Sequence, residues 1–530
     1  MLKRALVTLV FALITLIALV AVPPVSSPVR DAKRSVAVHA AANAQKKHKR
    51  RNVILMISDG IGFNGWLASD YFQHGEAGTQ RYQRRLASGQ PVAVYGMSHW
   101  GLTFVNKEGK PVAHDGSAMP PGAVGAIPQL YDPATRWDSF EGAFRWDFDP
   151  VNIAYTSYTD SAQSITAMVT GEKTTNGRLN MSWNAAQRLT TIAESADAAG
   201  YSTGAISSVQ VSHATPAGVW SHSPTRHAYR AIFDEMAASG LDVIMGAGHP
   251  WFDDDGKRRS EPDFKYIGQR AWEQATSKRG LNDFALIQSK EDFAAMASTS
   301  TPPRKLLGVA QVASTLQASR SQTSAQANTP SGDPFIQNVP TLADMTGAAL
   351  NVLGKNERGF FAMIEGGAVD WMNHANHLPR MIEEQIDFDL AVLAAMDWIE
   401  QHSSWEETTL IVTSDHDCGS LWAADTFKVA KEGETRFNPD RGDKAVGFTA
   451  IQNAGKGVVP AHQYASGYHT NDLVPLWVIG PGASSLQRFA KLDARAGALW
   501  GKPYGWDGRY IDTTELYRVM MRALELRMEP

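Results

Sequence analysis

The chain has 530 residues, of which 43% are hydrophobic and 20% are charged, an ordinary balance for a globular protein. The formal net charge is −4, but residues 1–51 hold ten Lys and Arg against one Asp, so the remainder is acidic, which argues against nucleic-acid binding as the main activity. The single cysteine, Cys418, excludes an intramolecular disulfide and a Cys-based zinc site, so we expect any metal to be held by His, Asp and Glu.

The N-terminus has the pattern of an export signal. A basic pair, Lys3 and Arg4, precedes an uncharged apolar run over residues 5–22. The run is also long enough to span a bilayer if it is not cleaved, and a small-residue AANA sequence further on offers a cleavage site. We expect residues 1–44 to be an export signal or membrane anchor with a leader, and 45–51 a basic linker. The protein would then be exported, to the periplasm or beyond the cell, or be anchored to the membrane.

From residue 52 onward, short apolar runs alternate with helical patterns. Five runs are typical of buried strands that end in polar or Gly-rich residues: NVILMIS (52–58), LDVIMGAG (241–248), FFAMIEG (360–366), TLIVTS (409–414) and LWVIGPG (476–482). The alternation predicts an α/β fold, a three-layer sandwich in which helices cover both faces of a large, mostly parallel sheet. Ligands bind such sheets beyond the carboxyl ends of the strands.

Two helices are predicted in detail from periodic apolar residues. In the segment 382–399, one apolar face consists of Ile382, Ile386, Leu390, Leu393 and Met396. The last helix begins with Asp512 and Glu515 as a capping pair, and it buries Leu516, Val519, Met520 and Leu524.

Two regions lack this periodicity. Residues 98–150 are rich in Gly, Pro and aromatic residues, which predicts a loop-rich insertion. Residues 314–333 are rich in Ser, Thr, Gln and Ala, which predicts a flexible surface loop in a second insertion near 310–335. We expect residues 52–530 to form one domain that carries both insertions.

Acidic and histidine side chains follow or flank the predicted strands. They are Asp59, Glu365, Asp370, His374, Asp415, His416 and His469. Each one alone is also explained as a turn residue, a strand-end cap, a helix-face pair or a surface histidine. Carboxylates and imidazoles in this number at the strand ends of one sheet suit Zn²⁺ and Mg²⁺, so their joint occurrence predicts a metal site.

The stretch YTDSAQSITAMVTGEKTTNG, residues 158–177, allows two interpretations. Asp160 and Ser161 satisfy the free amides of a short helix, which the segment alone favours. Alternatively, Ser161 is a nucleophile, held where the same amides and the helix dipole attract an anion.

Six motifs in chain order resemble those of the alkaline phosphatase family, over about residues 52–482. They are MISDGIG, YTDSAQSITAMVTGEKTTNG, SHATPAGVWSHSPTR, IEGGAVDWMNHAN, SDHDCG and GYHTND. The resemblance implies a metal-dependent phosphomonoesterase in which Ser161 is phosphorylated and Arg226 clamps the phosphate. It thereby favours the second interpretation of Ser161.

The resemblance also implies two Zn²⁺ and one Mg²⁺, each with its own ligands. The first Zn²⁺ would be held by Asp370, His374 and His469. The second would be held by Asp59, Asp415 and His416, with Ser161 as an exchangeable ligand. The Mg²⁺ would be held by Thr215, Glu365 and a bridging Asp59. A serine hydroxyl attacks at neutral pH only beside a base or a metal, and Zn²⁺ makes its alkoxide available.

Two positions near the expected site vary within the family. His213 stands where some members have Asp, and Trp371 where others have Lys or His, a pair that resembles certain bacterial alkaline phosphatases. His213 is either a hydrogen-bonding neighbour of the ligands or an imidazole that favours Zn²⁺ as the third metal. Trp371 carries no charge, so we expect product phosphate to be bound more loosely than in a Lys-bearing relative.

The resemblance further implies small phosphate monoesters as substrates and a homodimer, as is usual among relatives. The alternative functions are a phosphodiesterase or sulfatase of the same superfamily, or a non-catalytic metal- or phosphate-binding protein. Two matches to the sulfatase pattern S-x-P-x-R, at 26–30 and 300–304, have no neighbouring ligands. The Asp-Ser-Ala motif together with Arg226 favours the monoesterase.

Overall fold

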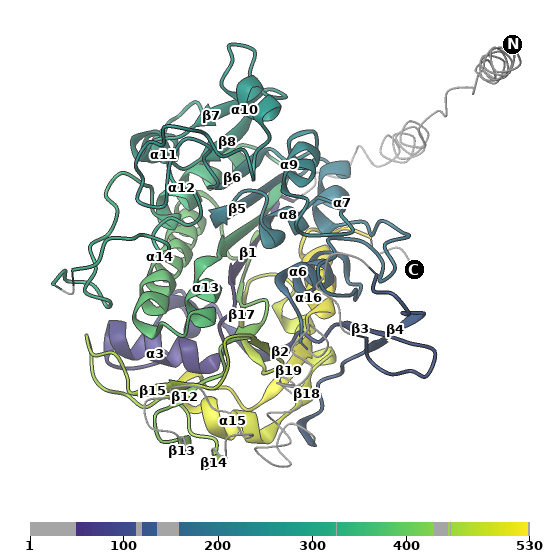
Figure 1. The fold of residues 1–530 in the computed structure, drawn as a ribbon, viewed down its shortest axis with the longest axis vertical. Helices are drawn as coiled ribbons and strands as arrows, with labels where there is room; N and C mark the ends of the chain where they lie inside the picture. Colours follow the sequence, from purple (N-terminus) through teal and green to yellow (C-terminus); the bar gives the residue numbers. More distant parts are fainter. Residues whose placement is uncertain are drawn as a thin grey trace, which may run out of the picture. The chain divides into compact units, whose positions relative to one another are not determined.

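The computed structural model describes residues 49–112, 119–134, 158–324, 326–428, 444–445 and 447–527 (Figure 1). The predicted export signal or anchor at 1–44 lies outside these residues, as does the end of the first insertion. Within the described ranges, no helix combines the length and the apolar character that crossing a membrane requires.

Eleven strands of the described chain form one sheet, in the order β18-β19-β2-β17-β10-β1-β9-β5-β6-β8-β7. In that order the strands are Lys491–Leu492, Arg509–Asp512, Ala93–Ser98, Val474–Ile479, Thr408–Thr413, Arg51–Ser58, Gly359–Gly366, Ser202–Gln210, Val243–Ala247, Lys305–Val309 and Phe284–Ile287. All five strands predicted from the sequence belong to this sheet, which confirms the expected α/β class.

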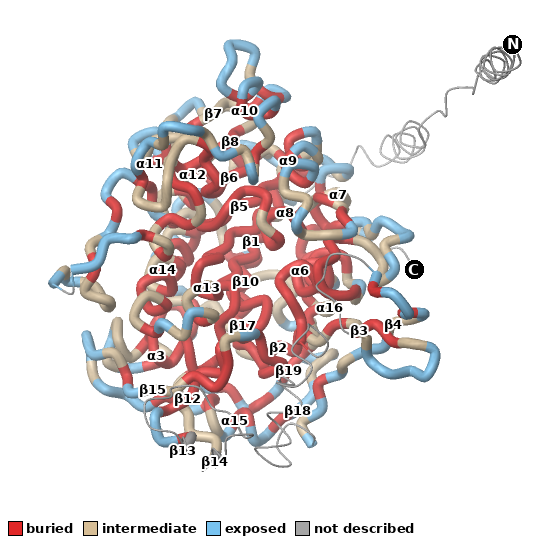
Figure 2. The backbone as a smooth tube through the Cα atoms, in the orientation of Figure 1, coloured by how far each residue is buried: buried red, intermediate tan, exposed pale blue. Residues whose placement is uncertain are grey.

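The middle of the sheet is parallel. β1 pairs in parallel with β10 and with β9, and the parallel pairing continues through β5, β6 and β8 to β7. Nearly every residue of the central strands β10, β1, β9 and β5 is buried (Figure 2), as expected for a sheet covered on both faces. The edge strand β18 runs antiparallel to β19, and inside the sheet β17 runs antiparallel to β10 and β2. Its beginning therefore lies at the edge where the parallel strands end.

Helices cover both faces of the sheet. Alternate residues of β1 point to opposite sides, so Ile54 and Met56 pack in one hydrophobic core and Val53, Leu55 and Ile57 in the other. The first core is covered by α3 (Phe63–His74), α12 (Leu342–Leu353) and α14 (Leu378–His402). The second is covered by α6 (Ser161–Thr170), α7 (Ile192–Ala198), α9 (Tyr229–Ala237) and α16 (Thr514–Ala523). The structure is the three-layer sandwich that the sequence predicts.

The two helices predicted in detail differ in part from expectation. α14 buries Ile382 and Met396, but Leu390 is exposed, because the buried stripe runs through Phe388 and Val392 instead. The expected apolar face is therefore wrong at Leu390.

The last helix, α16, buries all four predicted apolar residues. Its predicted capping pair is wrong. Asp512 Oδ1 accepts a hydrogen bond from Thr514 N at 3.1 Å, but Glu515 lies 3.7 Å from Arg518 and does not cap the helix.

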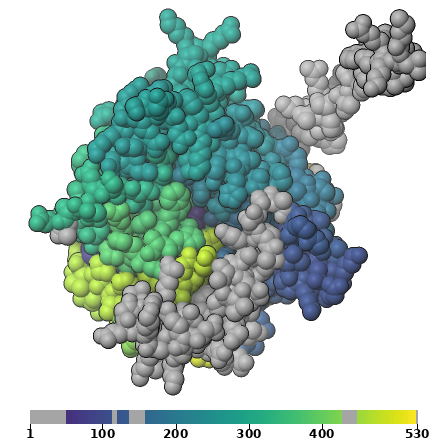
Figure 3. Space-filling view, viewed as in Figure 1, coloured from purple at the N-terminus to yellow at the C-terminus, as the bar shows by residue number. Residues whose placement is uncertain are grey.

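Both predicted insertions contain more structure than expected. In the first, β3 (Leu102–Val105) and β4 (Gly125–Pro128) form an antiparallel pair at the edge of the space-filling view (Figure 3). In the second, the described residues between 314 and 333 form no helix or strand, but the segment is not simply a surface loop. Leu316 and Arg320 are buried, and the Arg320 guanidinium pairs with Glu383 of α14 at 2.7 Å.

Candidate active site

The candidate side chains meet at one edge of the sheet because β10, β1 and β9 are neighbours and run in parallel. Asp59 follows β1, Glu365 is the next-to-last residue of β9, and Asp415 and His416 follow β10. The short helix α13 (Ala368–His374) comes directly after β9 and carries Asp370 and His374. His469 reaches the same edge from β16 (His469–Thr470), shortly before the antiparallel strand β17.

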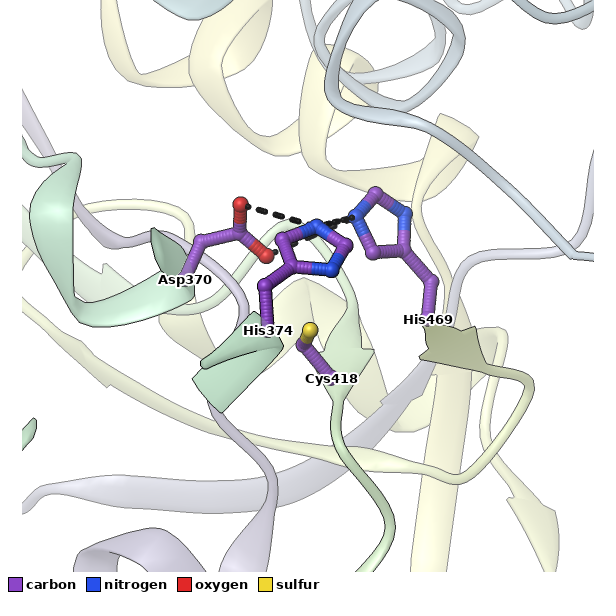
Figure 4. Close-up of side chains that lie close together, drawn as sticks. All are labelled: Asp370, His374, Cys418 and His469. Carbon is purple, nitrogen blue, oxygen red and sulfur yellow. Dashed lines mark hydrogen bonds and ion pairs between the residues drawn. The ribbon is translucent and has the colours of Figure 1, made fainter. Parts of the chain in front are cut away.

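Asp370, His374 and His469 form the first cluster, with their ligand atoms within 4.8 Å of one another (Figure 4). The Nε2 atoms of the two imidazoles are only 3.0 Å apart. Each Nδ1 faces a backbone carbonyl, Gly467 O at 2.7 Å and Thr159 O at 2.8 Å, and therefore carries a proton that it donates to that carbonyl. The two Nε2 atoms also lie 3.4 Å from Asp370 Oδ2 and Oδ1, so three ligand groups converge on one point. Although burial lowers the pKa of His374, Asp370 raises it to about 9, so a proton is held there without a metal, and a cation would replace it.

Cys418 joins this cluster, which the sequence did not predict. Its Sγ lies within the same 4.8 Å group, and it is fully buried because β11 (Asp417–Cys418) pairs with β16, opposite His469. Burial, followed by the neighbouring Asp370, raises the pKa of the thiol well above its usual value. The structure thus places a thiol beside the expected ligands, while the expectation that His, Asp and Glu hold the metal stays a prediction. The available signal was the position of Cys418 two residues after His416.

Asp59, Asp370 and His416 form a second group of ligand atoms, again within 4.8 Å. His416 Nε2 lies 3.6 Å from Asp59 Oδ1 and 3.2 Å from Asp415 Oδ2. Neither of these two carboxylate oxygens has a hydrogen bond, although both are buried. Buried oxygens without donors are what a cation would satisfy.

The residues expected to hold the third ion also surround Asp59. Thr215 Oγ1 donates to Asp59 Oδ2 at 3.4 Å. Glu365 accepts a short hydrogen bond from Ser207 through Oε2, while its Oε1 is buried without a partner. The structure thus brings Thr215 and Glu365 to the same carboxylate.

The charges of this site are not balanced by the protein alone. Burial, followed by Asp415, raises the pKa of Asp59 well above its usual value. Burial likewise raises the pKa of Asp415 to about 6 and that of Glu365 to about 7. Asp370 differs: although burial raises its pKa, His374 and His469 together outweigh this effect and hold the pKa well below its usual value. Carboxylates buried this close together favour protons or metal ions.

Ser161 is the first residue of α6, and its side chain does not cap the helix. Asp160 is the cap, since its Oδ1 accepts from Gln163 N at 2.9 Å. Ser161 Oγ instead lies 3.2 Å from His416 Nε2, which belongs to the second group of possible metal ligands. The capping interpretation therefore holds for Asp160, and the nucleophile interpretation of Ser161 stays a prediction.

Arg226 is held by the same aspartate. Its Nη1 donates to Asp160 Oδ2 at 2.9 Å, and its Nη2 lies 3.5 Å from His213 Nε2. Burial, followed by Arg226, lowers the pKa of His213 to about 3, so the imidazole is neutral. The His213 ring packs edge-on against Trp371, with centroids 5.9 Å apart. These contacts place His213 beside the arginine as a hydrogen-bonding neighbour.

A cavity of about 500 Å³ opens over these groups and is lined by Ser161, Arg226, Asp370, His374 and His469. Aromatic side chains form much of its remaining wall, namely Tyr158, Tyr229, Trp371 and Tyr468. The Tyr158 and Tyr468 rings lie 6.4 Å apart and within 25° of parallel. The sequence identified only Trp371 among these four residues.

Known proteins resemble this chain in sequence and in fold. The family model described as "Alkaline phosphatase" matches residues 150–472. An alkaline phosphatase of Escherichia fergusonii is 29% identical over 361 residues, which cover 62% of this chain and 70% of that protein. Alkaline phosphatase 3 of Bacillus subtilis is 28% identical, and the match spans 52% of this chain and 54% of that protein, about half its length. The alkaline phosphatase structure of Thermus thermophilus has the same fold, with a TM-score of 0.55 and 18% identity, over 91% of this chain and 93% of that one.

Proposed function

We propose, from the premise that this chain belongs to the alkaline phosphatase family, that it hydrolyses phosphate monoesters through a phosphoserine formed at Ser161. Family membership makes the chain a phosphatase that uses divalent metal ions. The observation that carries the proposed mechanism is the position of Ser161 Oγ. It lies 3.2 Å from His416 Nε2, at a helix N-terminus and in the same cavity as Arg226.

Two Zn²⁺ and one Mg²⁺ are the proposed cofactors. Each set of residues fits a cation because it contains a buried carboxylate oxygen without a hydrogen-bond partner. One Zn²⁺ would bind to Asp370, His374 and His469. The other would bind to Asp59, Asp415 and His416. Mg²⁺ would bind to Asp59, Thr215 and Glu365. When bound, these ions lower the pKa of a nearby hydroxyl and stabilise negative charge on phosphate oxygens.

The protein groups orient the reaction. Ser161 Oγ attacks phosphorus in line with the ester oxygen, so that a Ser–O–P bond forms as the P–O bond to the alcohol breaks. Arg226 offers its remaining N–H groups to two phosphate oxygens, and its planar fork is fixed by Asp160. The amides at the start of α6 add positive potential where the phosphate lies. A water molecule then cleaves the Ser–O–P bond and releases phosphate.

Export and a homodimer are part of the proposal. The basic pair Lys3 and Arg4 before the apolar run 5–22 supports export, with either cleavage or retention as an anchor. Sequencing the N-terminus of the protein isolated from each cell fraction would distinguish cleavage from anchoring. Light scattering would give the oligomeric state.

Trapping the phosphoserine tests the mechanism. Incubation with labelled monoester followed by acid quenching should label the protein at Ser161, and Ser161→Ala should abolish the label and lower kcat by more than about 10³-fold. The exposed Ser277→Ala is the matched control and should retain both. Labelling of a different residue, or full activity of Ser161→Ala, would refute the proposal.

A phosphodiesterase or sulfatase of the same superfamily is the second candidate function. Comparing aryl phosphate, bis-aryl phosphate and aryl sulfate as substrates separates the three activities. We expect the monoester to have the highest kcat/KM, because the guanidinium of Arg226 suits the two non-bridging oxygens of a dianionic phosphate.

A further inference from the structure

A second cavity, of about 260 Å³, shares no lining residue with the active-site cavity. It lies between helix α14 and the segment 335–341, which leads into α12. Its apolar wall consists of Phe335, Ile336, Val339, Pro340, Ile386 and Leu390. Phe335 and Leu390 are 39% and 48% exposed, so apolar surface is also accessible to solvent there.

Glu384 lines this cavity with an unpaired carboxylate. The residue is only 5% exposed, and none of the residues that the structure describes forms a hydrogen bond or ion pair with it. Burial of an unpaired carboxylate is costly, and a proton or a cation with hydrogen-bond donors removes much of this cost. The Glu384 carboxylate therefore accepts no hydrogen bond from the residues that the structure describes.

The two nearby arginines already have other partners. Arg320 pairs with Glu383 at 2.7 Å, and Arg380 pairs with Asp333 at 2.8 Å. Both act on Glu384 only at longer range, where they favour its ionised form.

The remaining neighbours also leave the carboxylate unpaired. Asp387 is one turn further along α14 and accepts a hydrogen bond from Leu342 N at 3.1 Å, so it adds a second negative charge. Lys290, in α11 (Lys290–Ser298), also lines the cavity, but its Nζ donates to the Gln337 carbonyl at 3.1 Å. The cavity thus combines apolar walls with three acidic side chains, Glu383, Glu384 and Asp387, against one basic side chain.

We propose that this cavity binds a small organic cation, a primary ammonium group on a short apolar body. The ammonium N–H groups donate to the Glu384 carboxylate, and the negative charge of Asp387 adds attraction, which is strong away from bulk water. The apolar body packs against Phe335, Ile386 and Leu390 and removes their exposed surface from water.

A divalent cation fits this cavity less well. In the described part of the chain, no three His, Cys, Asp or Glu side chains lining it bring their ligand atoms within 4.8 Å of one another. The apolar walls supply no further oxygens, whereas Ca²⁺ takes six to eight oxygen ligands. Calcium is therefore the competing outcome of the experiment.

Calorimetric titration of the full chain with n-hexylammonium chloride tests the proposal, with n-hexanol, hexanoate and CaCl₂ as separate probes. We expect one hexylammonium per chain, and binding of the alcohol and the carboxylate that is at least about tenfold weaker. Glu384→Gln should weaken hexylammonium binding by at least about tenfold. The exposed Glu406→Gln should leave it unchanged.

The pH dependence provides a second measurement. Burial, followed by Asp387 and Glu383, raises the pKa of Glu384 to about 8, whereas Arg320 and Arg380 act in the opposite direction. An alkylammonium keeps its charge to about pH 10, as lysine does. Binding at pH 7 should therefore release a proton from Glu384, and affinity should rise between pH 7 and pH 9.

Three results would overturn the proposal. They are binding of CaCl₂ in place of hexylammonium, equal binding of hexanol and hexylammonium, and equal hexylammonium affinity in the wild type and Glu384→Gln. If no probe binds, the proposal is also wrong, and Glu384 is a protonated acid without a ligand.

Discussion

At the scale of single residues, the adjacent side chains of Asp160 and Ser161 have different roles at the start of α6. Asp160 caps the helix through one carboxylate oxygen and holds Gly177 N and Arg226 through the other. Because the cap is already in place, the Ser161 hydroxyl is not needed for it and lies beside His416. One aspartate therefore positions the helix of the proposed nucleophile and the proposed phosphate clamp together.

Trp371→Lys is expected to strengthen inhibition by inorganic phosphate. The Trp371 ring lines the cavity beside His213, and a lysine there would add a positive charge near the phosphate. A partly exposed ion pair contributes about 1 kcal/mol, so the inhibition constant should fall about fivefold. Trp251→Lys, which lies outside the cavity lining, is the control. An unchanged inhibition constant for Trp371→Lys would contradict the expectation.

Tyr468 should affect which alcohol leaves most readily. Its exposed ring lies near and almost parallel to Tyr158, at the wall of the cavity, where a planar leaving group can pack against it. Tyr468→Leu should lower kcat/KM for phenyl phosphate relative to ethyl phosphate by about threefold. Tyr468→Phe keeps the ring and should keep the ratio. Equal ratios in the leucine and phenylalanine variants would show that the ring has no such effect.

At the scale of elements, the turn from β1 to α3 has no room for a side chain. Gly60 has φ +67°, and a Cβ there would lie 2.4 Å from Asp370 Oδ1. Its amide also donates to Asp415 Oδ1 at 3.0 Å. The backbone of this turn thus touches residues of both proposed zinc sites.

Gly60→Ala should therefore lose bound metal and activity together. Gly457 is a matched control, because it has φ +77° but no atom within 4 Å of an added Cβ. Gly457→Ala should cost only about 1 kcal/mol of backbone strain and keep its metal. Metal analysis and thermal unfolding of both variants would check this. Equal metal content in the two would mean that Asp370 moves aside without consequence.

The sequence predicted the strands whose apolar residues are contiguous and missed those that are short or interrupted by polar residues, even where these are buried, as β5 is. β1, β9 and β10 are continuous apolar runs, which is the pattern of a central parallel strand. β5 contains three serines and β18 only two residues, so neither gives such a signal. The antiparallel direction of β17 depends on which strands it pairs with, which its own residues do not encode.

At the scale of the whole molecule, the site is assembled from segments far apart in the chain. His469 Nδ1 donates to Thr159 O, 310 residues earlier, and Ser161 reaches His416 across 255 residues. The ligand residue types and their strand-end positions were readable from the sequence. The facing Nε2 atoms and the presence of Cys418 were not, because they depend on the pairing of β16 with β11.

Metal removal should destabilise the whole fold, and more so at alkaline pH. In the metal-free protein, the folded-state pKa is about 6 for Asp415 and about 7 for Glu365, both raised by burial above their unfolded values. The stability that these protonated groups provide is present at low pH and is lost as pH rises through 6 to 7. A bound cation replaces these protons, so its affinity should rise over the same range.

Thermal unfolding with and without chelator at pH 5.5 and pH 8 measures this effect. Each ion at a hundred times its dissociation constant adds about 2.7 kcal/mol to the free energy of unfolding, so the melting temperature should fall on chelation, with the larger fall at pH 8. Ser161→Ala keeps every other proposed ligand and should show a similar fall despite having no activity, which separates stability from catalysis. If chelation shifts melting equally at both pH values, the carboxylates were not exchanging protons for metal. In that case the buried oxygens of Asp59 and Asp415 would need another partner.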